Sequence, residues 1–450
     1  WSNGSVGMYG EGYSGFAAWA AATHAPPALK AIATADPDAP GINWPMAGNI
    51  FHNAAYRWAQ QVTGSRGDES DLDEDAAWRA LDDTWYRSGR RYRDLERINK
   101  RSNRYFQRWL NHPSYDRFWQ SMIPFREQFA SIAIPVLTQS GYFSPGQIGA
   151  LYYFEQHQKY NANADHTLLL GPYAWASGDR PGALLRRLPV DPVARLELTT
   201  LRYRWLDHVL KGAARPAVLQ NRVNFQTMGT NEWHHSPSLA AMATDSLRLF
   251  LDAKQVDGNH LLLQRDTPNT TSVRTETSLK DVVDLPVEGS DDLLAAALPT
   301  SPALVYASER FATAIDIAGV VTGRLDVTPN KQDFDLRLSL YEQLSNGEYV
   351  KLFDPSAVFR ASYAADRVHR RLLKSGRRQQ VIFNSERVTS RRIAAGSRLV
   401  LVLGINLRPD QQINYGAGND VSEESRSVDG RYPLRIRWHS SSFIEVPVRK

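Results

Sequence analysis

The chain has 450 residues, of which 42% are hydrophobic and 10% aromatic, and its formal net charge is +5. It contains no cysteine, which excludes disulfide scaffolds, thiolate metal sites and cysteine nucleophiles. The length corresponds to about two to four domains, and the apolar content is enough to fill their cores. No apolar run is long enough for a membrane span, and the small positive charge does not by itself indicate nucleic acid binding.

The first 42 residues have the pattern of an α/β unit. Residues 5–10 predict a short buried strand that ends in glycines, residues 16–24 a small-residue helix, and residues 30–35 a second strand. Residues 43–130 then predict a helical insertion, with near-helical apolar spacing over 71–100 and Gly89 as a candidate break. An acidic stretch (68–83) precedes an arginine-rich one (88–108), which indicates ion pairing between helices. A patch that binds an anionic ligand is the alternative for these arginines.

The α/β pattern resumes over residues 131–215. Strands are predicted at 132–138 and 167–170, and helices at 154–160 and 194–210. From residue 216 to 450 many short strands alternate with Gly, Pro and Asn turns, which is typical of a β-sandwich, here a jelly roll. The fold class is therefore α/β plus all-β: an α/β core with a helical cap, followed by a jelly-roll sandwich.

The end of the first strand carries the pattern from which chemistry is expected. The segment, called the elbow below, is Gly10-Glu-Gly12-Tyr13-Ser14-Gly15. A sharp turn between a strand and a small-residue helix is where an α/β-hydrolase presents its nucleophile, and it leaves backbone N–H groups at the helix start to hold an oxyanion.

The elbow and several later segments resemble the CocE/NonD hydrolases, a family of cocaine esterases, α-amino-acid ester hydrolases, glutaryl acylases and X-Pro dipeptidyl-peptidases. The family elbow reads Gly-x-Ser-Tyr-x-Gly, and this chain has Gly10-x-Gly12-Tyr13-x-Gly15. The resemblance covers nearly the whole chain. Its other segments are residues 29–33, 109–119, 171–173, 204–212, 229–233 and 413–416.

The resemblance implies a serine mechanism whose three catalytic positions are occupied by other residues. The family serine falls on Gly12, the acid on Ser144 and the base on Trp175. Glycine has no nucleophilic atom and an indole accepts no proton at neutral pH. The backbone N–H of Tyr13 would still contribute to an oxyanion hole, while Glu11 would place negative charge beside it. The expectation is a catalytically degenerate homologue.

Two alternatives stay open. The first is an active hydrolase that uses Ser14 as a displaced nucleophile; the structural interpretation is a serine in the first turn of a helix. Asp36 or Asp38 could be its acid, although these residues also fit a simple Asp-Pro-Asp turn. The base would be one of the histidines His24, His52, His112 and His157. The second is a ligand- or carbohydrate-binding protein that acts through the jelly roll. His208 fits a packed helix position, and the His234-His235 pair has no suitably spaced carboxylate for a metal.

The expected ligand is a small ester, amide or related molecule in a capped pocket. No cofactor, no metal, no nucleic acid and no membrane is expected, and the compartment and the oligomeric state stay open. In the family further strands precede the elbow. The resemblance therefore implies a core without its first half, and either a fragment or another chain or segment that supplies those strands.

Overall fold

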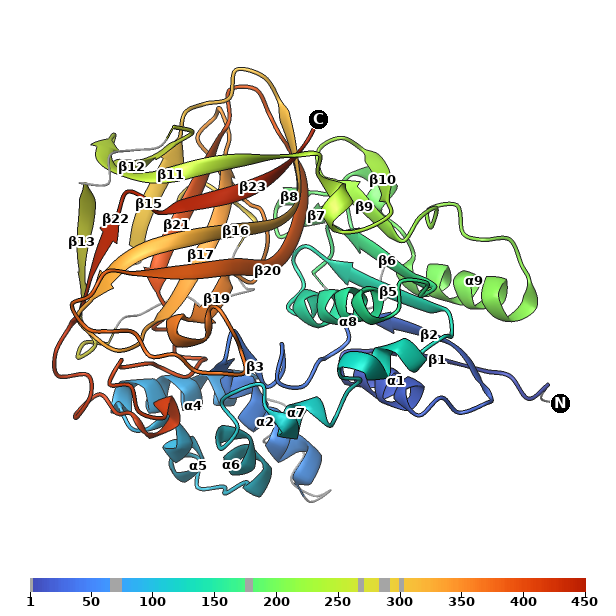
Figure 1. The fold of residues 1–450 in the computed structure, drawn as a ribbon, viewed down its shortest axis with the longest axis horizontal. Coiled ribbons are helices and arrows are strands. Elements are labelled where there is room, and N and C mark those ends of the chain that lie inside the picture. Colours follow the sequence, from blue (N-terminus) through green and yellow to red (C-terminus); the bar gives the residue numbers. More distant parts are fainter. Residues whose placement is uncertain (1–2, 65–74, 175–180, 266–270, 283–291, 299–302) are drawn as a thin grey trace.

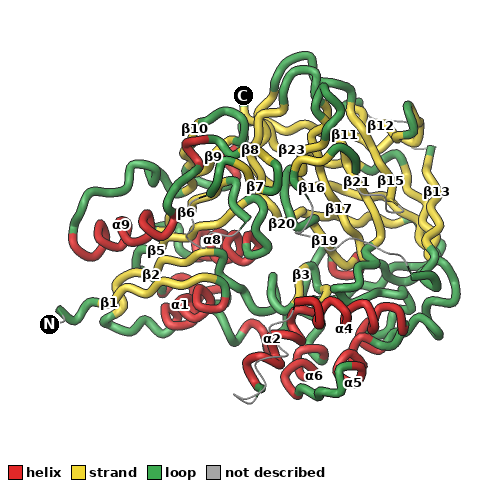
Figure 2. The backbone as a smooth tube through the Cα atoms, turned by 180° about the vertical axis from the view of Figure 1, so that it is seen from behind, coloured by secondary structure: helices red, strands yellow, loops and turns green. Residues whose placement is uncertain are grey.

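The computed structural model describes residues 3–64, 75–174, 181–265, 271–282, 292–298 and 303–450. An α/β part and a large β-sandwich lie side by side, and a group of helices lies below the sandwich in the view of Figure 1. The view from behind shows the same three parts, with the helices concentrated at the bottom and in the α/β part (Figure 2). The predicted fold class is confirmed.

The α/β part is built on a six-stranded sheet in the order β1-β2-β5-β6-β9-β10. All strand pairs are parallel except β9 with β10. The strands are β1 (Val6–Glu11), β2 (Leu29–Ala35), β5 (Val136–Gly141), β6 (His166–Gly171), β9 (Val223–Thr227) and β10 (Glu232–Ser236). The sequence pattern assigned residues 223–236 to the sandwich. The structure instead extends the α/β sheet with them, because β9 pairs with β6 through Leu168, Leu169 and Leu170.

Helices cover both faces of this sheet, as the alternation along β2 requires. Ala31, Ala33 and Ala35 pack against α9 (Leu198–Lys211), while Ile32 belongs to the core on the side of α1 (Tyr13–Thr23) and α8 (Gln147–Tyr160). The small alanine side chains let α9 approach the sheet closely. Helix α8 begins seven residues before the predicted helix, because residues 147–153 also turn apolar side chains inward.

The helical segment lies between β2 and β5 in the chain. Its elements are α2 (Asn53–Thr63), α4 (Asp75–Ser88), η1 (Tyr92–Asp94), α5 (Leu95–Ile98), α6 (Arg104–Leu110), α7 (Arg117–Gln120) and η2 (Arg126–Ser131). The predicted break is found at Gly89, which has φ +64 and follows the last residue of α4. Aromatic rings of Tyr56, Trp78, Tyr92 and Phe106 pack together at the centre of this segment.

The sandwich contains a thirteen-stranded sheet system within the described residues. Its strands are β11 (Asp245–Val256), β12 (Asn259–Leu263), β13 (Ser272–Thr277), β14 (Leu294–Ala295), β15 (Ala303–Ser308), β16 (Ile315–Pro329), β17 (Asp335–Gln343), β18 (Tyr349–Lys351), β19 (Ala357–Arg360), β20 (Gln379–Ile393), β21 (Arg398–Ile405), β22 (Leu434–His439) and β23 (Phe443–Arg449). Four short strands form two separate ribbons: β3 (Met46–Ala47) with β4 (Ile50–Phe51), and β7 (Leu184–Leu185) with β8 (Leu188–Pro189).

Short 3-10 turns complete the described elements: η3 (Pro192–Ala194), η4 (Ala240–Met242), η5 (Ala361–Tyr363) and η6 (Val421–Glu423). Helix α8 connects the two main parts. The amide of Gln147 bonds to both backbone groups of Val388 in β20, at 2.9 and 3.0 Å. None of the helices that the structure describes combines the length and the apolar character needed to cross a membrane.

Candidate functional site

The elbow forms a sharp turn between β1 and α1. Gly12 stands at the N-cap of α1 with φ 50 and ψ −118, a conformation that side chains with a Cβ adopt only at a cost. Its carbonyl accepts from Phe16 N–H at 3.0 Å and from Asp38 N–H at 3.0 Å. The N–H groups of the first turn, beginning with Tyr13, have no partner within the helix. The turn thus has the geometry that lifts a residue above the sheet.

Close packing explains the two flanking glycines. A Cβ at Gly10 would lie 2.4 Å from the backbone carbon of Ser14, and one at Gly15 would lie 2.9 Å from the Pro37 side chain. A Cβ at Gly12 would meet only Asp38 Oδ2, at 3.6 Å. The elbow therefore demands glycine at 10 and 15 for space, whereas position 12 has room for a side chain.

The Asp36-Pro37-Asp38 turn brings carboxylates to the elbow. It follows β2, whose carboxyl end lies beside that of β1 in the parallel sheet. Asp36 is fully buried and accepts from the Ser140 hydroxyl at 2.5 Å. Asp38 accepts from the Asn43 amide at 3.4 Å and points its Oδ2 toward Gly12.

Burial raises the pKa of two carboxyl groups near the elbow, those of Asp38 and Glu11. Burial raises the pKa of Asp38 to about 6; the Asn43 hydrogen bond opposes this and the charge of Asp36 adds to it. The pKa of Glu11 is also raised, by burial and by Asp36, against the attraction of Arg202. Arg202, on α9, is 5% exposed. An oxyanion at the start of α1 would form near the Asp38 carboxyl, whose Oδ2 faces Gly12, and the ionised form of that carboxyl would repel it.

Aromatic side chains surround the same turn. Tyr13 is 56% exposed, and its ring contacts Phe16 of α1 and Trp58 of α2, with centroid separations of 5.5 and 5.6 Å. The helical segment thus contributes a ring to the neighbourhood of the elbow. Apolar rings beside a polar turn are suited to hold the organic part of a small ligand.

Ser144 lies beyond β5 and is fully buried. Its hydroxyl accepts from Gly146 N–H at 3.1 Å, and its carbonyl accepts from Arg387 of β20 at 2.6 Å. These contacts hold the loop that precedes α8. Trp175 lies outside the described residues.

The residues considered for a displaced site have different surroundings. Ser14 is exposed in the first turn of α1, two residues after Gly12. His24 is the C-cap at the opposite end of that helix. His112 bonds to Asp116, and His52 bonds to Gln411 of the sandwich.

His157 belongs to a buried polar chain under the sheet. Its Nε2 lies 2.9 Å from the Ile132 carbonyl, which can only accept, so Nε2 carries the proton. Its Nδ1 then accepts from His166 Nδ1 at 3.2 Å, and His166 Nε2 accepts from Thr138 at 2.9 Å. Burial lowers the pKa of both histidines, most strongly that of His166. Every ring nitrogen is used, which identifies a structural network.

The remaining candidate side chains also have local partners. His208 bonds to the Ala213 carbonyl at 2.7 Å, and His235 bonds to Asn224 at 2.8 Å. In the described ranges no group of three or more His, Asp or Glu side chains is arranged to hold a metal. The arginine-rich stretch forms ion pairs, for example Arg91 with Asp94 at 3.0 Å and Arg93 with Glu423 at 2.5 Å.

Sequence reasoning undervalued Asp38 and did not single out Arg202. The signal for Asp38 was present, because the carboxyl ends of adjacent parallel strands meet at one edge of a sheet. Arg202 carries no such signal, since only the packing of α9 brings it to Glu11.

Two family models match the chain in the order of its two parts. The first, X-Pro dipeptidyl-peptidase (S15 family), matches residues 1–175. The second, X-Pro dipeptidyl-peptidase C-terminal non-catalytic domain, matches residues 217–403. The chain therefore combines an S15-family X-Pro dipeptidyl-peptidase domain with the C-terminal domain of that family, and it is a homologue of cocaine esterase. The resemblance predicted from the elbow and the later segments is confirmed.

Several known proteins are similar along nearly the whole chain. The cocaine esterase of Rhodococcus sp. (strain MB1 Bresler) is 24% identical over 94% of this chain and 77% of its own length. An aminopeptidase from a marine sediment Thaumarchaeota archaeon has TM-score 0.80 at 18% identity, with 100% of this chain and 77% of that one covered. An α-amino acid ester hydrolase has TM-score 0.76 at 18% identity with the same coverage. These structures share the fold.

Proposed function

We propose that this chain is a catalytically degenerate member of its hydrolase family that binds a small ester or amide without cleaving it by the serine mechanism. The observation that carries the proposal is Gly12: the turn has the strained backbone that would present a nucleophile, and the residue there has no side chain. A serine mechanism needs a hydroxyl at this point and a base within hydrogen-bond reach of it.

Two further features support the proposal. The Ser144 hydroxyl accepts from Gly146 N–H, and a serine supplies no carboxylate to stabilise the charge of a protonated base. The Asp38 carboxyl faces Gly12 and, once ionised, opposes the negative charge of a tetrahedral intermediate. The rings of Tyr13, Phe16 and Trp58 remain beside the turn and would contact a bound acyl group.

The two alternatives have less support. Ser14 is exposed, and the histidines considered as its base are bonded or located elsewhere. A carbohydrate platform on the sandwich would need a set of exposed rings. Among the sandwich residues that the structure describes, Tyr432 is the one large aromatic side chain with high exposure, at 76%.

The test combines turnover, labelling and binding. The wild-type chain is incubated with p-nitrophenyl acetate and butyrate, an alanine-linked chromogenic amide and a fluorophosphonate probe. We expect no turnover above buffer and no labelled serine, while p-nitrophenyl butyrate binds and is recovered intact. Turnover together with a labelled serine would overturn the proposal.

Two variants make the result specific. If the probe does label the wild type, the Ser14→Ala variant is tested next. Loss of the label in this variant would identify Ser14 as a displaced nucleophile. Gly12→Ser restores a hydroxyl where a Cβ has room. We expect it to fold and to stay unlabelled on the time scale of an active serine hydrolase, since no base is supplied. Rapid labelling at residue 12 would show that a base is present after all.

A further inference from the structure

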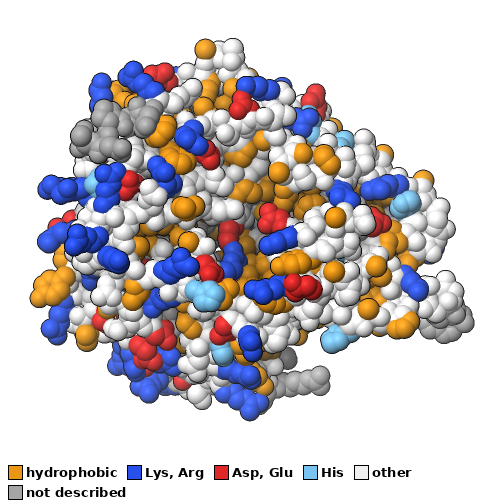
Figure 3. All heavy atoms as spheres, viewed as in Figure 1, with side chains coloured by type: hydrophobic (Ala, Val, Ile, Leu, Met, Phe, Trp, Pro, Cys, Tyr) orange, Lys and Arg blue, Asp and Glu red, His pale blue; other side chains and the backbone are white. Residues whose placement is uncertain are grey.

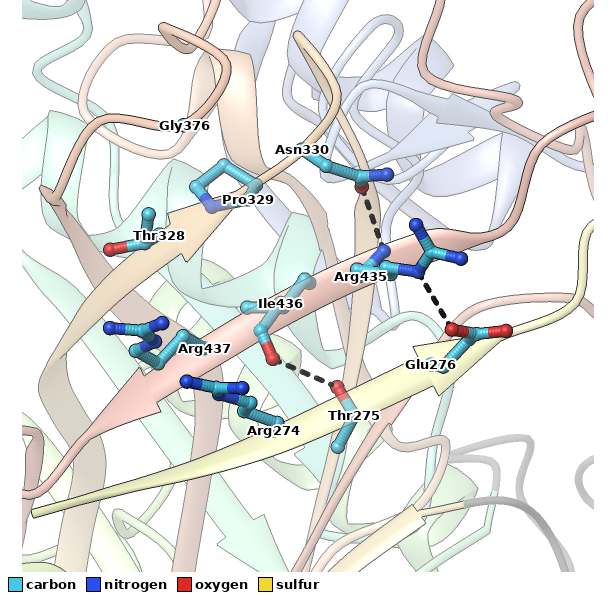
Figure 4. Close-up of a pocket in the computed structure, with 10 residues that line it drawn as sticks. All are labelled: Arg274, Thr275, Glu276, Thr328, Pro329, Asn330, Gly376, Arg435, Ile436 and Arg437. Carbon is cyan, nitrogen blue, oxygen red and sulfur yellow. Dashed lines mark hydrogen bonds and ion pairs between the residues drawn. The ribbon is translucent and has the colours of Figure 1, made fainter.

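A pocket of about 480 Å³ opens on the sandwich, far along the chain from the elbow. It lies over β13, β22 and the end of β16, and Arg274, Glu276, Thr328, Asn330, Arg435 and Arg437 are among its lining residues (Figure 4). Figure 3 shows Lys and Arg side chains gathered along the edge of the sandwich that carries β13 and β22, at the left of that view. The volume is in the range of small-molecule sites.

The strand register places two of these arginines opposite each other. Arg274 of β13 pairs with Arg437 of β22, and Arg437 pairs in turn with Thr328 of β16. Figure 4 shows the two arginine side chains next to each other on one face of the sheet. Like charges directly opposite in an antiparallel pair repel, so this arrangement destabilises the sheet unless an anion lies between them.

The acidic groups near this pair are bonded to other arginines. Glu276 accepts from Arg435 at 2.7 Å, and Asp326 accepts from Arg378 at 2.6 and 2.9 Å. Among the described residues neither Arg274 nor Arg437 has an ion pair. The pocket lining therefore carries three arginines against one glutamate, with the excess on the Arg274–Arg437 pair.

The remaining lining groups indicate how large the ligand is. The Asn330 side chain bonds to the Arg435 N–H at 2.7 Å and to the Pro433 carbonyl at 3.1 Å, so it holds the wall of the pocket. Pro329 and Ile436 also line the pocket, but both are buried, so the side chains exposed in its wall are polar ones. The volume exceeds that of a lone phosphate or sulfate ion, which leaves room for an organic group.

We propose that this arginine pocket binds the phosphate or sulfate group of a small organic ligand between the guanidinium groups of Arg274 and Arg437. Guanidinium groups bond to such oxyanions through paired N–H donors, and a doubly charged anion would remove the repulsion between the two arginines. The site is separate from the elbow and does not depend on the function proposed there.

The experiment measures binding of inorganic phosphate, inorganic sulfate and phenyl phosphate to the full chain, by calorimetric titration and by thermal unfolding, with sodium chloride at matched ionic strength. We expect both inorganic anions to raise the unfolding temperature above the chloride value, and phenyl phosphate to bind more tightly than phosphate. Comparing the affinity for phosphate with the affinity for sulfate shows which of the two oxyanion groups the pocket prefers.

Arg274→Gln/Arg437→Gln should bind phosphate at least about tenfold more weakly, because two charge-assisted contacts are lost. Without anion, Arg437→Gln alone should unfold at a higher temperature than the wild type. The control Arg79→Gln/Arg117→Gln removes the same charge from exposed helical positions and should bind like the wild type. Equal binding by both double variants would overturn the proposal. So would tight binding of a polyanion such as heparin without any effect of phosphate or phenyl phosphate.

Discussion

Gly12 differs from the two other glycines of the elbow, because close packing does not require a glycine at position 12. Gly10 and Gly15 are required because a Cβ there would collide with the backbone of Ser14 or with Pro37. A Cβ at Gly12 would make an ordinary contact with Asp38. Only the backbone angle favours glycine there, and holding another residue in that conformation costs about 1–3 kcal/mol. The absence of a side chain at Gly12 is therefore not imposed by packing.

Asp38 provides the prediction at this scale. Its pKa is about 6 in the folded chain and 3.8 as the ordinary value, so the folded state holds the proton more tightly. Stability from this group is present below about pH 4 and is lost as pH rises through about 6. Asp38→Asn should be more stable than the wild type by about 2–3 kcal/mol at pH 8 and equal to it near pH 4. Urea unfolding across this range measures the difference.

Asn43→Ala is the companion variant. Because Asn43 donates to Asp38, its removal should move the midpoint of the pH dependence above that of the wild type. A stability difference between Asp38→Asn and the wild type that does not change with pH would contradict the assignment.

At the scale of elements, two helices hold the turn that carries Asp38. Gly15 of α1 lies against Pro37, and Gly149 of α8 lies against the Pro37 carbonyl, where an added Cβ would come within 2.1 Å. The nearby Gly146 packs against Asp36 in the same way, with 2.4 Å to its Cβ. Close helix packing, permitted by glycine, thus fixes the carboxylates beside the elbow.

Gly149→Ala tests this packing. In an exposed helix, alanine in place of glycine stabilises by about 1 kcal/mol. Here the change should destabilise by about 2 kcal/mol or more, because the collision partner is backbone and cannot rotate away. Denaturant unfolding measures it, with Lys159→Ala on the exposed side of the same helix as the control, expected within about 0.5 kcal/mol of the wild type. A neutral or stabilising Gly149→Ala would show that the turn is not clamped.

At the scale of the whole molecule, the sandwich and the α/β part share buried polar contacts. Asp354 of the sandwich accepts from Lys351 and, at 2.7 Å, from Arg186 of the α/β part. Its N–H donates to the carbonyl of Tyr142, two residues before Ser144. Because Asp354 is 2% exposed, these charges interact in a dry environment at the contact between the two parts.

Asp354→Ala should therefore lower the free energy of unfolding by about 3–5 kcal/mol. The change removes the carboxylate that pairs with Lys351 and Arg186, so the buried charge of Lys351 loses this partner. Thermal unfolding followed by calorimetry measures the loss. The exposed pair of Arg187 with Asp292, at 3.3 Å, is the matched control, and Asp292→Ala should cost about 1 kcal/mol or less. Similar losses for both variants would contradict a buried interface role for Asp354.

The strand and helix periods predicted most elements of the α/β part, because each amphipathic period is local in sequence. The elbow was found from its glycines between a strand and a small-residue helix, although only the contact of Gly10 with Ser14 is local and Gly15 is required by the more distant Pro37. The strands within residues 223–236 join the α/β sheet, although the family model of the C-terminal domain begins at residue 217. The strand pattern alone does not indicate which of the two sheets a strand joins. For β9 this is decided by its pairing with Leu168–Leu170 of β6.

The sequence by itself determined the fold class, the family and the residues that stand at the elbow, because these depend on local pattern and on the order of motifs along the chain. Only the tertiary structure decided what surrounds them. Asp38 faces Gly12 because two parallel strands end side by side, and Arg202 approaches Glu11 because α9 packs on alanines. Arg274 and Arg437 share a pocket because β13 and β22 pair in one register. Such contacts join residues far apart in sequence, and their energies arise from burial and charge that exist only in the folded chain.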